Sequence, residues 1–249
     1  MEPGISRYSR HELLRVIGKD GQKKILRSRV FIAGLGALGS LIAMLLTRAG
    51  IGFLRIVDLD APETHNLQRQ LLYTQTHVIK GVSKAQAALE VLKEINSEIE
   101  IESVTASIGR DNIESLTNGI DLVVDALDNI TTRYIVNDTI LKRRIPYIFG
   151  GAVETSGNIM TIIPGRTPCL RCLWPESDAV KGHASAATVG VLSATAAAVA
   201  SIQVAEVMKV LTGHIDDTLS GLLVMDLWKN MYHVVPVERD PSCLCHTID

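Results

Sequence analysis

The feature that most constrains the fold is a glycine-rich turn between a short apolar segment and a helical one. Residues 29–33 have the composition of a buried strand, residues 34–39 are Gly-Leu-Gly-Ala-Leu-Gly, and a helical pattern continues to Ala49. A second apolar run at 53–57 ends at Asp58. This order predicts a βαβ unit, in which the backbone of the turn can approach phosphate groups at the helix N-terminus.

The first 150 residues continue the alternation of strand and helix. We expect helices at the ranges 10–26, 83–95 and 131–143, and strands at the ranges 100–105, 121–125 and 147–149. Continuously apolar strands are typical of a parallel sheet that helices cover on both faces. The predicted fold is therefore α/β, Rossmann-like and doubly wound.

The pattern changes after Gly150 and Gly151. Further strands are expected at 158–163, 222–225 and 231–235, as an antiparallel C-terminal extension of the sheet. Between them, residues 184–205 carry no charge over about a membrane-spanning length, but their Ala, Ser and Thr content favours a buried helix. Gln203, Glu206 and Lys209 follow at helical spacing and are expected to form a solvated stripe.

Composition excludes several classes of protein. The chain has 25 basic and 27 acidic residues and only 4% aromatics, so a basic groove with stacking rings for nucleic acid is not expected. The first 15 residues lack the apolar segment of a signal peptide or membrane anchor. We expect a cytoplasmic protein with neither nucleic acid nor membrane as a partner.

Polar residues near the predicted strand ends limit which class of nucleotide the site can bind. With Asp58, or Asp60 nearby, as a ribose acceptor, the glycine turn alone would suggest a nicotinamide-dependent dehydrogenase. However, Asn66 and Arg69 follow in the sequence Asn-Leu-Gln-Arg-Gln, and a guanidinium suits phosphate oxygens better than a nicotinamide ring. Asp128 follows the strand at 121–125 and suits magnesium.

Together these motifs resemble the adenylation site of the MoeB/ThiF/HesA family, relatives of ubiquitin-activating enzymes. The resemblance rests on residues 34–39, Asp58 with Asp60, residues 66–70, Lys84 and the turn at 127–129. Residues 7–10 and 20–22 also resemble the opening of the family. The resemblance extends from about Arg7 to Cys245. It implies a single adenylation domain over 1–249, with a nucleotide-binding half (1–150) and a second half (151–249).

The resemblance implies ATP and Mg²⁺ as cofactors and a site that is partly shared between subunits. The residues implied to line ATP are Gly34, Gly36, Ala37, Gly39, Asp58, Asn66, Arg69, Lys84 and Asp128; Lys80 is an alternative to Lys84. The residues implied in catalysis are Arg10, Arg69, Lys84 and Asp128. Arg10 would reach the site of a neighbouring subunit, which implies a homodimer.

The implied reaction is adenylation of the C-terminal glycine of a ubiquitin-like sulfur-carrier protein that ends in Gly-Gly, with release of pyrophosphate. A peptide or a small carboxylate is an alternative substrate, and a non-catalytic scaffold subunit is an alternative role. Arg10, Arg69 and Asp128 argue against the scaffold, which would not need them. The pathway, whether molybdopterin, thiamine or tRNA thiolation, stays open.

Four cysteines form two close pairs, Cys169 with Cys172 and Cys243 with Cys245. In a reducing cytosol this arrangement favours a metal site over disulfides. The resemblance implies a structural Zn²⁺, but the second pair here is one residue tighter than in the family. His246 could replace Cys245, and free or redox-active thiols remain an alternative.

Relatives that form a covalent thioester carry a cysteine near the place that Ala186 occupies in this chain, so no such adduct is expected.

Overall fold

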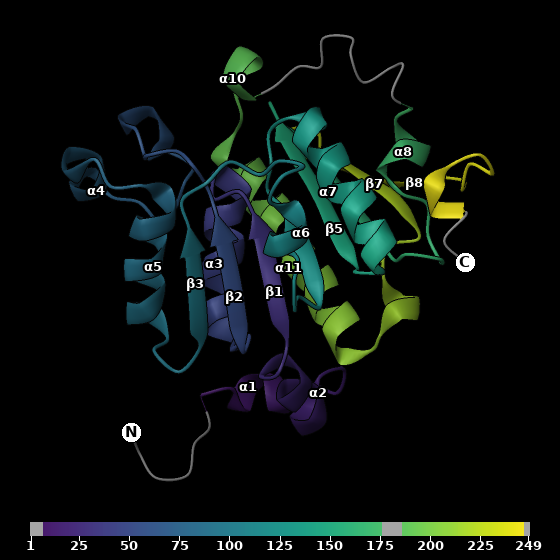
Figure 1. The fold of residues 1–249 in the computed structure, drawn as a ribbon, viewed down its shortest axis with the longest axis horizontal. Coiled ribbons are helices and arrows are strands. Elements are labelled where there is room, and N and C mark those ends of the chain that lie inside the picture. The colour runs from purple at the N-terminus through teal and green to yellow at the C-terminus, as the bar shows by residue number, and fades with distance from the viewer. Residues whose placement is uncertain (1–6, 176–185, 247–249) are drawn as a thin grey trace.

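The computed structural model describes residues 7–175 and 186–246, and its described strands form one eight-stranded sheet (Figure 1). The strand order is β3-β2-β1-β4-β5-β6-β7-β8. The first five strands in this order pair in parallel and the last three add antiparallel. The strands are β1 (Arg29–Ala33), β2 (Phe53–Val57), β3 (Glu100–Val104), β4 (Leu122–Asp125), β5 (Tyr147–Val153), β6 (Ser156–Ile162), β7 (Gly221–Asp226) and β8 (Met231–Pro236). The predicted fold class is confirmed.

Helices cover both faces of this sheet because alternate strand residues point to opposite sides. One core cluster joins β-strand residues such as Ile32 and Leu54 to α2 (Gly18–Ile25), α3 (Ala37–Ala49), α5 (Lys84–Ile95) and α11 (Ser193–Thr212). The other joins Phe31 and Tyr147 to α6 (Ile113–Leu116), α7 (Ile130–Arg143) and α8 (Leu170–Leu173). The remaining helices are short: α1 (Ser9–Glu12), α4 (Gln75–Lys80), α10 (Ala186–Val189), η1 (Thr64–Asn66), η2 (Ile215–Asp217) and η3 (Leu244–His246).

Two predicted helices have different bounds in the structure. The segment 10–26 forms α1 and α2 rather than one helix, and Gly18, the first residue of α2, has a φ of +61°, which a continuous helix does not allow. The Ala-rich helix begins at Ser193 rather than at 184, after the separate turn of α10; residues 184 and 185 lie outside the described part. By length and composition α11 could cross a membrane, but its apolar side packs on the sheet and α3.

The predicted solvated stripe on α11 is wrong for two of its three residues. Gln203 is fully buried and Glu206 is 1% exposed. The Glu206 carboxylate accepts hydrogen bonds from the Thr161 hydroxyl, at 2.6 Å, and from Lys209. Lys209 lies on the same helix at i+3, but Thr161 comes from β6, so the contact that buries Glu206 could not be read from the spacing along α11.

The N-terminal segment lies at the far end of the sheet from the glycine turn. The Tyr8 hydroxyl accepts a hydrogen bond from Asn96 at 3.0 Å, and its ring packs so closely on Gly50 that a Cβ there would collide with it. Gly50 ends α3, whose 13 residues span about 20 Å from the turn. Arg10 follows in α1, which Figure 1 shows below the sheet with α2, while the loops after the parallel strands lie at the top.

Candidate nucleotide site and cysteine cluster

The glycine turn lies at the point where the strand order reverses, between β1 and β4. Chains with open α/β sheets bind ligands in the crevice outside the carboxyl ends of the strands at such a point. Gly34 has a φ of +95°, and a Cβ on it would stand 2.7 Å from the carbonyl oxygen of Ala126, in the loop after β4. Only glycine combines this backbone conformation with so close an approach. Gly36 then caps α3, which begins at Ala37.

Asp58, at the end of β2, ties that strand to the turn. One carboxylate oxygen accepts a hydrogen bond from the N–H of Leu35 at 2.7 Å, and the other from the N–H of Asp60 at 2.9 Å. Burial raises the pKa of Asp58, and the nearby Lys84 and these hydrogen bonds oppose the rise. The buried Tyr73, which the sequence did not suggest, donates its hydroxyl to the carbonyl of Leu35 at 2.8 Å and holds the turn from the other side.

Lys84 rather than Lys80 stands beside these acidic residues. Its ammonium lies 2.9 Å from a carboxylate oxygen of Asp60, and its side chain is only 7% exposed. Its own N–H donates to the carbonyl of Asp60 at 2.7 Å, which fixes the start of α5 against the loop after β2. Lys80 is exposed at the end of α4. The structure therefore brings one buried ammonium to the edge that carries Asp58.

Arg69 lines a cavity of about 220 Å³ at the beginning of α3 and α11. Ala37, Leu41 and Ser193 are among the other residues of its wall. The guanidinium of Arg69 donates to the carbonyl of His65 at 2.9 Å. A half-buried cation thus lies within the same edge of the sheet as the glycine turn.

Asn66 is 5% exposed, and its carboxamide oxygen accepts a hydrogen bond from the N–H of Glu63 at 3.0 Å. This bond is one half of a capping box on η1. The contact gives Asn66 a structural role in the loop after β2, separate from the ATP contact that the sequence resemblance implies for it.

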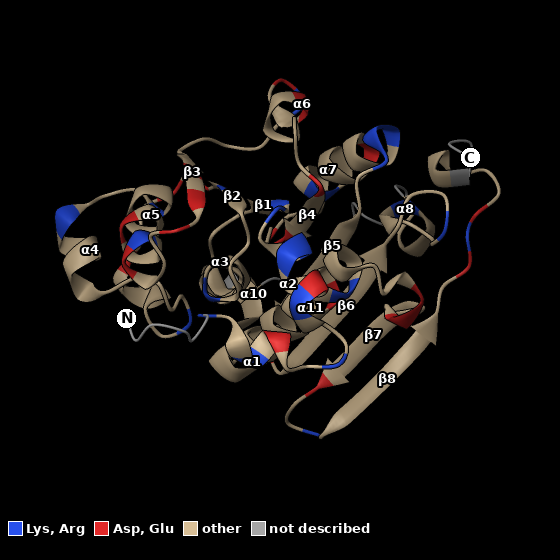
Figure 2. Ribbon diagram, turned by 90° about the horizontal axis from the view of Figure 1, so that it is seen from below, with Lys and Arg blue, Asp and Glu red and all other residues tan. Residues whose placement is uncertain are grey.

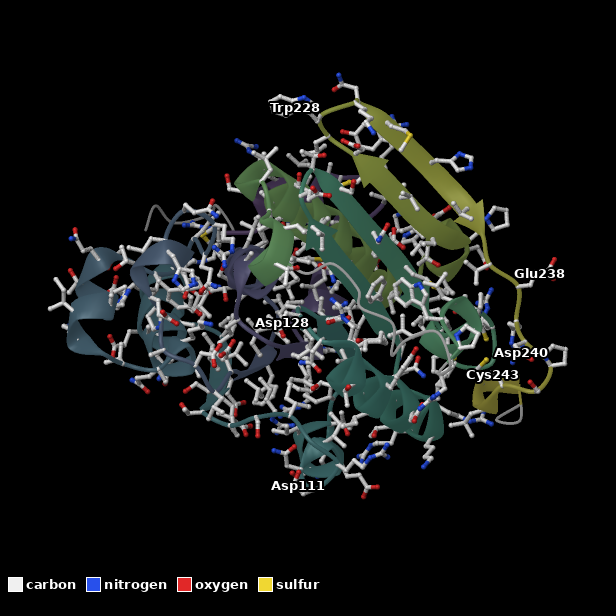
Figure 3. The ribbon with its side chains drawn as sticks, turned by 90° about the horizontal axis from the view of Figure 1, so that it is seen from above. Asp111, Asp128, Trp228, Glu238, Asp240 and Cys243 are labelled. Atoms are coloured by element: carbon white, nitrogen blue, oxygen red, sulfur yellow. The ribbon has the colours of Figure 1, made fainter. Side chains whose placement is uncertain are left out.

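Asp128 is exposed and lies in the loop between β4 and α7, near the centre of the face seen in Figure 3. Asn129 caps α7 by accepting from the N–H of Thr132 at 2.9 Å, which fixes the residue after Asp128. A carboxylate that is exposed to solvent at this edge suits a hard cation such as Mg²⁺.

A buried ion pair beneath this loop was missed by the sequence analysis. The fully buried carboxylate of Asp125 lies 3.0 Å from the guanidinium of Arg133 and accepts from the N–H of Leu127 at 2.8 Å. Burial raises the pKa of Asp125, and the charge of Arg133 opposes the rise. The hydrogen bond to Leu127 bends the chain directly before Asp128. The sequence shows a charged residue at a strand end, but it does not show that this residue pairs with Arg133, eight residues further on in α7.

The four cysteines gather at the margin of the sheet, where Figure 3 labels Cys243. Their sulfurs all lie within 4.8 Å of one another, and the closest pairs across the two segments are Cys169 with Cys243 at 3.5 Å and Cys172 with Cys245 at 3.3 Å. In a tetrahedral zinc site with bonds of about 2.3 Å, sulfurs are about 3.8 Å apart. The set therefore fits a closed four-thiolate site; the His246 side chain lies outside the described part.

The fold and this edge define an α/β protein with a glycine-rich turn at the switch point of the sheet. The chain belongs to the ThiF family, whose model matches residues 8–245. This confirms the family resemblance seen in the sequence motifs.

Curated relatives and solved structures agree with that membership. The chain is 43% identical over 98% of its length to the sulfur carrier protein ThiS adenylyltransferase of Bacillus subtilis, covering 72% of it. It is 35% identical over 96% of its length to the SAMP-activating enzyme E1 of Haloferax volcanii, covering 87% of it. The crystal structure of E. coli MccB with ATP shares the fold, with a TM-score of 0.83, 22% identity, and coverage of 98% of this chain and 75% of that one.

Proposed function

We propose that this chain is an ATP-dependent adenylyltransferase that activates the C-terminal glycine of a ubiquitin-like sulfur-carrier protein. The observation that carries the proposal is the gathering of the glycine turn, Asp58, Lys84, Arg69 and Asp128 at one edge of the sheet. Relatives at 43% and 35% identity are named for the activation of the carriers ThiS and SAMP.

One orientation of ATP at this edge would use all of these groups. The turn from Gly34 to Gly39 and the N-terminus of α3 receive its phosphates, and Asp58 accepts hydrogen bonds from the ribose. Arg69 faces the α-phosphate, and Lys84 exchanges its partner Asp60 for phosphate oxygens. Asn66 supports the loop between them. Asp128 would hold Mg²⁺, and the ion would supply neutralisation of phosphate charge.

The reaction needs alignment more than proton transfer. A carboxylate oxygen of the carrier's terminal glycine attacks the α-phosphorus of ATP and forms a new P–O bond. The bond from that phosphorus to the α,β-bridging oxygen breaks, and pyrophosphate leaves with the electron pair. A carboxylate is already ionised at neutral pH, so no general base is required. The role of Arg69 and Lys84 is to hold the reactants in line and to offset charge in the transition state.

Arg10 completes the site of a second subunit. Within its own subunit the Tyr8 anchor at Gly50 keeps α1 about 20 Å from the glycine turn, the length of α3. Exposed apolar side chains follow Arg10 directly, with Leu13 at 72% and Val16 at 62% exposure. Such a segment is suited to an interface between copies of the chain. These features support a homodimer with two composite sites.

A folded protein suits the C-terminal half better than a small carboxylate. Strand β8 is the last strand of the described sheet, so within residues 7–175 and 186–246 one of its edges has no neighbouring strand, and β8 carries no Lys, Arg, Asp or Glu (Figure 2). Tyr232 is 58% exposed there, and Trp228 in the preceding turn is 77% exposed. An unpaired edge with exposed apolar and aromatic side chains is typical of a surface that binds another protein.

The cysteine cluster supplies a structural zinc site rather than a catalytic one. Burial raises the pKa of Cys169 and Cys245, the latter to about 12, so zinc displaces protons when the thiolates bind it. The site joins η3 near the C-terminus to α8 and thereby fixes the chain that follows β8.

Substrate-dependent exchange of pyrophosphate into ATP tests the proposal. We expect exchange with small ubiquitin-like proteins that end in Gly-Gly, and none with the same carriers lacking the last glycine. The C-terminal hexapeptide of a carrier and free glycine are the matched comparisons. Exchange with the peptide or glycine but with no carrier would identify a different acyl substrate, and no exchange with any of them would refute an active adenylyltransferase.

A further inference from the structure

The side chain of Gln203 crosses from α11 to the ends of two parallel strands. Its amide nitrogen donates to the carbonyl oxygen of Asp125 at 2.8 Å and to that of Ile148 at 3.1 Å. Asp125 is the last residue of β4, and Ile148 is the last residue of β5 that pairs with β4. Gln203 therefore binds the two strands where their own hydrogen bonding stops.

The amide of Gln203 suits the position. Both targets are acceptors, so the side chain must present two N–H donors from one nitrogen, which an ionised carboxylate or an alkyl group does not have. A Cβ on Gly150 would collide with the amide of Gln203, so the glycine in β5 makes the space for it. The side chain is fully buried, which makes the loss of its donors costly for the two carbonyls left behind.

The strand end that Gln203 holds is the base of the loop that carries Asp128. The carboxylate of Asp125 bonds to the N–H of Leu127, one residue before Asp128. Arg133 pairs with the same carboxylate and donates to the carbonyl oxygens of Leu127 and Gly150. Gln203 fixes the main chain of Asp125, while Arg133 fixes its side chain, so the loop is held from both faces of the sheet.

We propose that Gln203 is a positioning residue that sets the place of Asp128 through the main chain of Asp125. The inference rests on the proposed function, because Asp128 matters only if it acts on the metal and phosphates. It gives α11 a second role beyond filling the core, since a movement of this helix at Gln203 shifts the loop of the site.

The test compares Gln203→Met, which keeps the volume and removes both donors, with Thr161→Val. The control removes the hydroxyl that bonds to Glu206 on the same helix; Thr161 lies in β6, opposite Ile148 and two strands away from β4, so it tests damage to the same part of the core without removing the donors of Gln203. We expect Gln203→Met to lower kcat for carrier-dependent exchange by about tenfold or more with little change in the KM for ATP, as expected for misplacement of a group acting on the bound reactants. Thr161→Val should lose stability but keep its kcat.

A double variant distinguishes positioning from general damage. In an Asp128→Asn background, Gln203→Met should cause little further loss, because the group that it positions is already gone. The proposal would be overturned if Gln203→Met lowered kcat by the same factor in the Asp128→Asn background as in the parent. Exchange by Gln203→Met within about twofold of the parent would also overturn it, since this is less than one lost buried hydrogen bond predicts.

Hydrogen exchange measured by mass spectrometry tests the geometry without activity. In the protein without ligands, amides of residues 125–133 should exchange faster in Gln203→Met than in the parent or in Thr161→Val, and unchanged protection would contradict the proposal. If the parent lacks adenylation activity, the proposed function fails while this measurement still decides the contact. If Gln203→Met does not fold, Gln203→Glu replaces it. The protonated carboxyl group of this variant donates one hydrogen bond and the ionised group donates none, so the protection of residues 125–133 relative to the parent should fall from about pH 6 to about pH 8. A relative protection that does not change with pH would refute the role of Gln203.

Discussion

The carboxylate of Asp58 and the N–H of Leu35 are joined by a hydrogen bond of 2.7 Å, which connects the end of β2 to the glycine turn. The same carboxylate is the proposed acceptor for the ribose, so one side chain both shapes the turn and recognises the nucleotide. The ionisation of Asp58 should therefore change the affinity of the site for ATP.

The affinity for ATP should depend on pH through Asp58. Burial raises the pKa of this carboxyl above 3.8 in the folded protein, so its contribution to stability is full below the unfolded pKa and lost as pH rises through the folded one. Ribose binding has the opposite sign, because the ionised form accepts hydrogen bonds. Binding of a non-hydrolysable ATP analogue, measured from about pH 4.5 to about pH 7.5, should strengthen with pH, and Asp58→Asn should flatten that dependence. An equally steep profile in the variant would exclude Asp58 as its source.

Arg69→Ala should lower carrier-dependent pyrophosphate exchange by about a hundredfold or more, because a cation facing the α-phosphate is lost. Folding should be retained, since the guanidinium of Arg69 donates its hydrogen bond to the carbonyl of His65 within the same exposed loop. Arg48→Ala is the matched control: Arg48 is an exposed arginine in the last turn of α3. Parent-like exchange by Arg69→Ala would refute the assignment.

Mixing two inactive variants should restore activity if sites are shared between subunits. Arg10→Ala and Asp128→Ala each inactivate every site in their own homodimers, whereas a hybrid dimer contains one site with both residues intact. Mixed protein should recover up to about a quarter of parent activity when subunits exchange at random. Mass spectrometry of differently labelled subunits confirms the exchange, and an absence of recovery in hybrid dimers would show that Arg10 does not act in the partner's site.

Metal analysis should find one zinc per chain, and chelation should lower the thermal midpoint without abolishing nucleotide binding. Loss of one thiolate from a closed structural site weakens the metal and frees the tail that it holds. Cys245→Ser should therefore release zinc, and Ser242→Ala beside the cluster serves as a control. A metal-free protein with unchanged stability would contradict a structural zinc.

No covalent thioester should form between this enzyme and its carrier. All four cysteines of the chain lie in the cluster, and Ala186 stands where a nucleophilic cysteine was sought in the sequence. Enzyme, ATP and carrier should give no thiol-sensitive band on a non-reducing gel while pyrophosphate exchange is robust. An adduct that disappears in Cys245→Ala would show instead that this thiol is an acceptor.

The local sequence was sufficient for the elements whose signals are themselves local. The apolar run at β1, the turn from Gly34 to Gly39 and the strand ending at Asp58 lie within about 30 residues, and each imposes its conformation through neighbouring residues. The family followed from the order of such motifs. The pairing of Cys243 and Cys245 with the first knuckle was foreseen as one of several possibilities.

Only the tertiary structure decided contacts between distant segments. On α11 a polar residue at every third position has the spacing of a solvated face, and nothing within the helix indicates that Gln203 meets carbonyl groups 55 and 78 residues away. From the sequence, Lys84 was the preferred phosphate contact and Lys80 the alternative, and the tertiary structure shows that Lys84 lies against Asp60. Burial and hydrogen bonding depend on what packs across an element, and a one-dimensional pattern records only what lies along it.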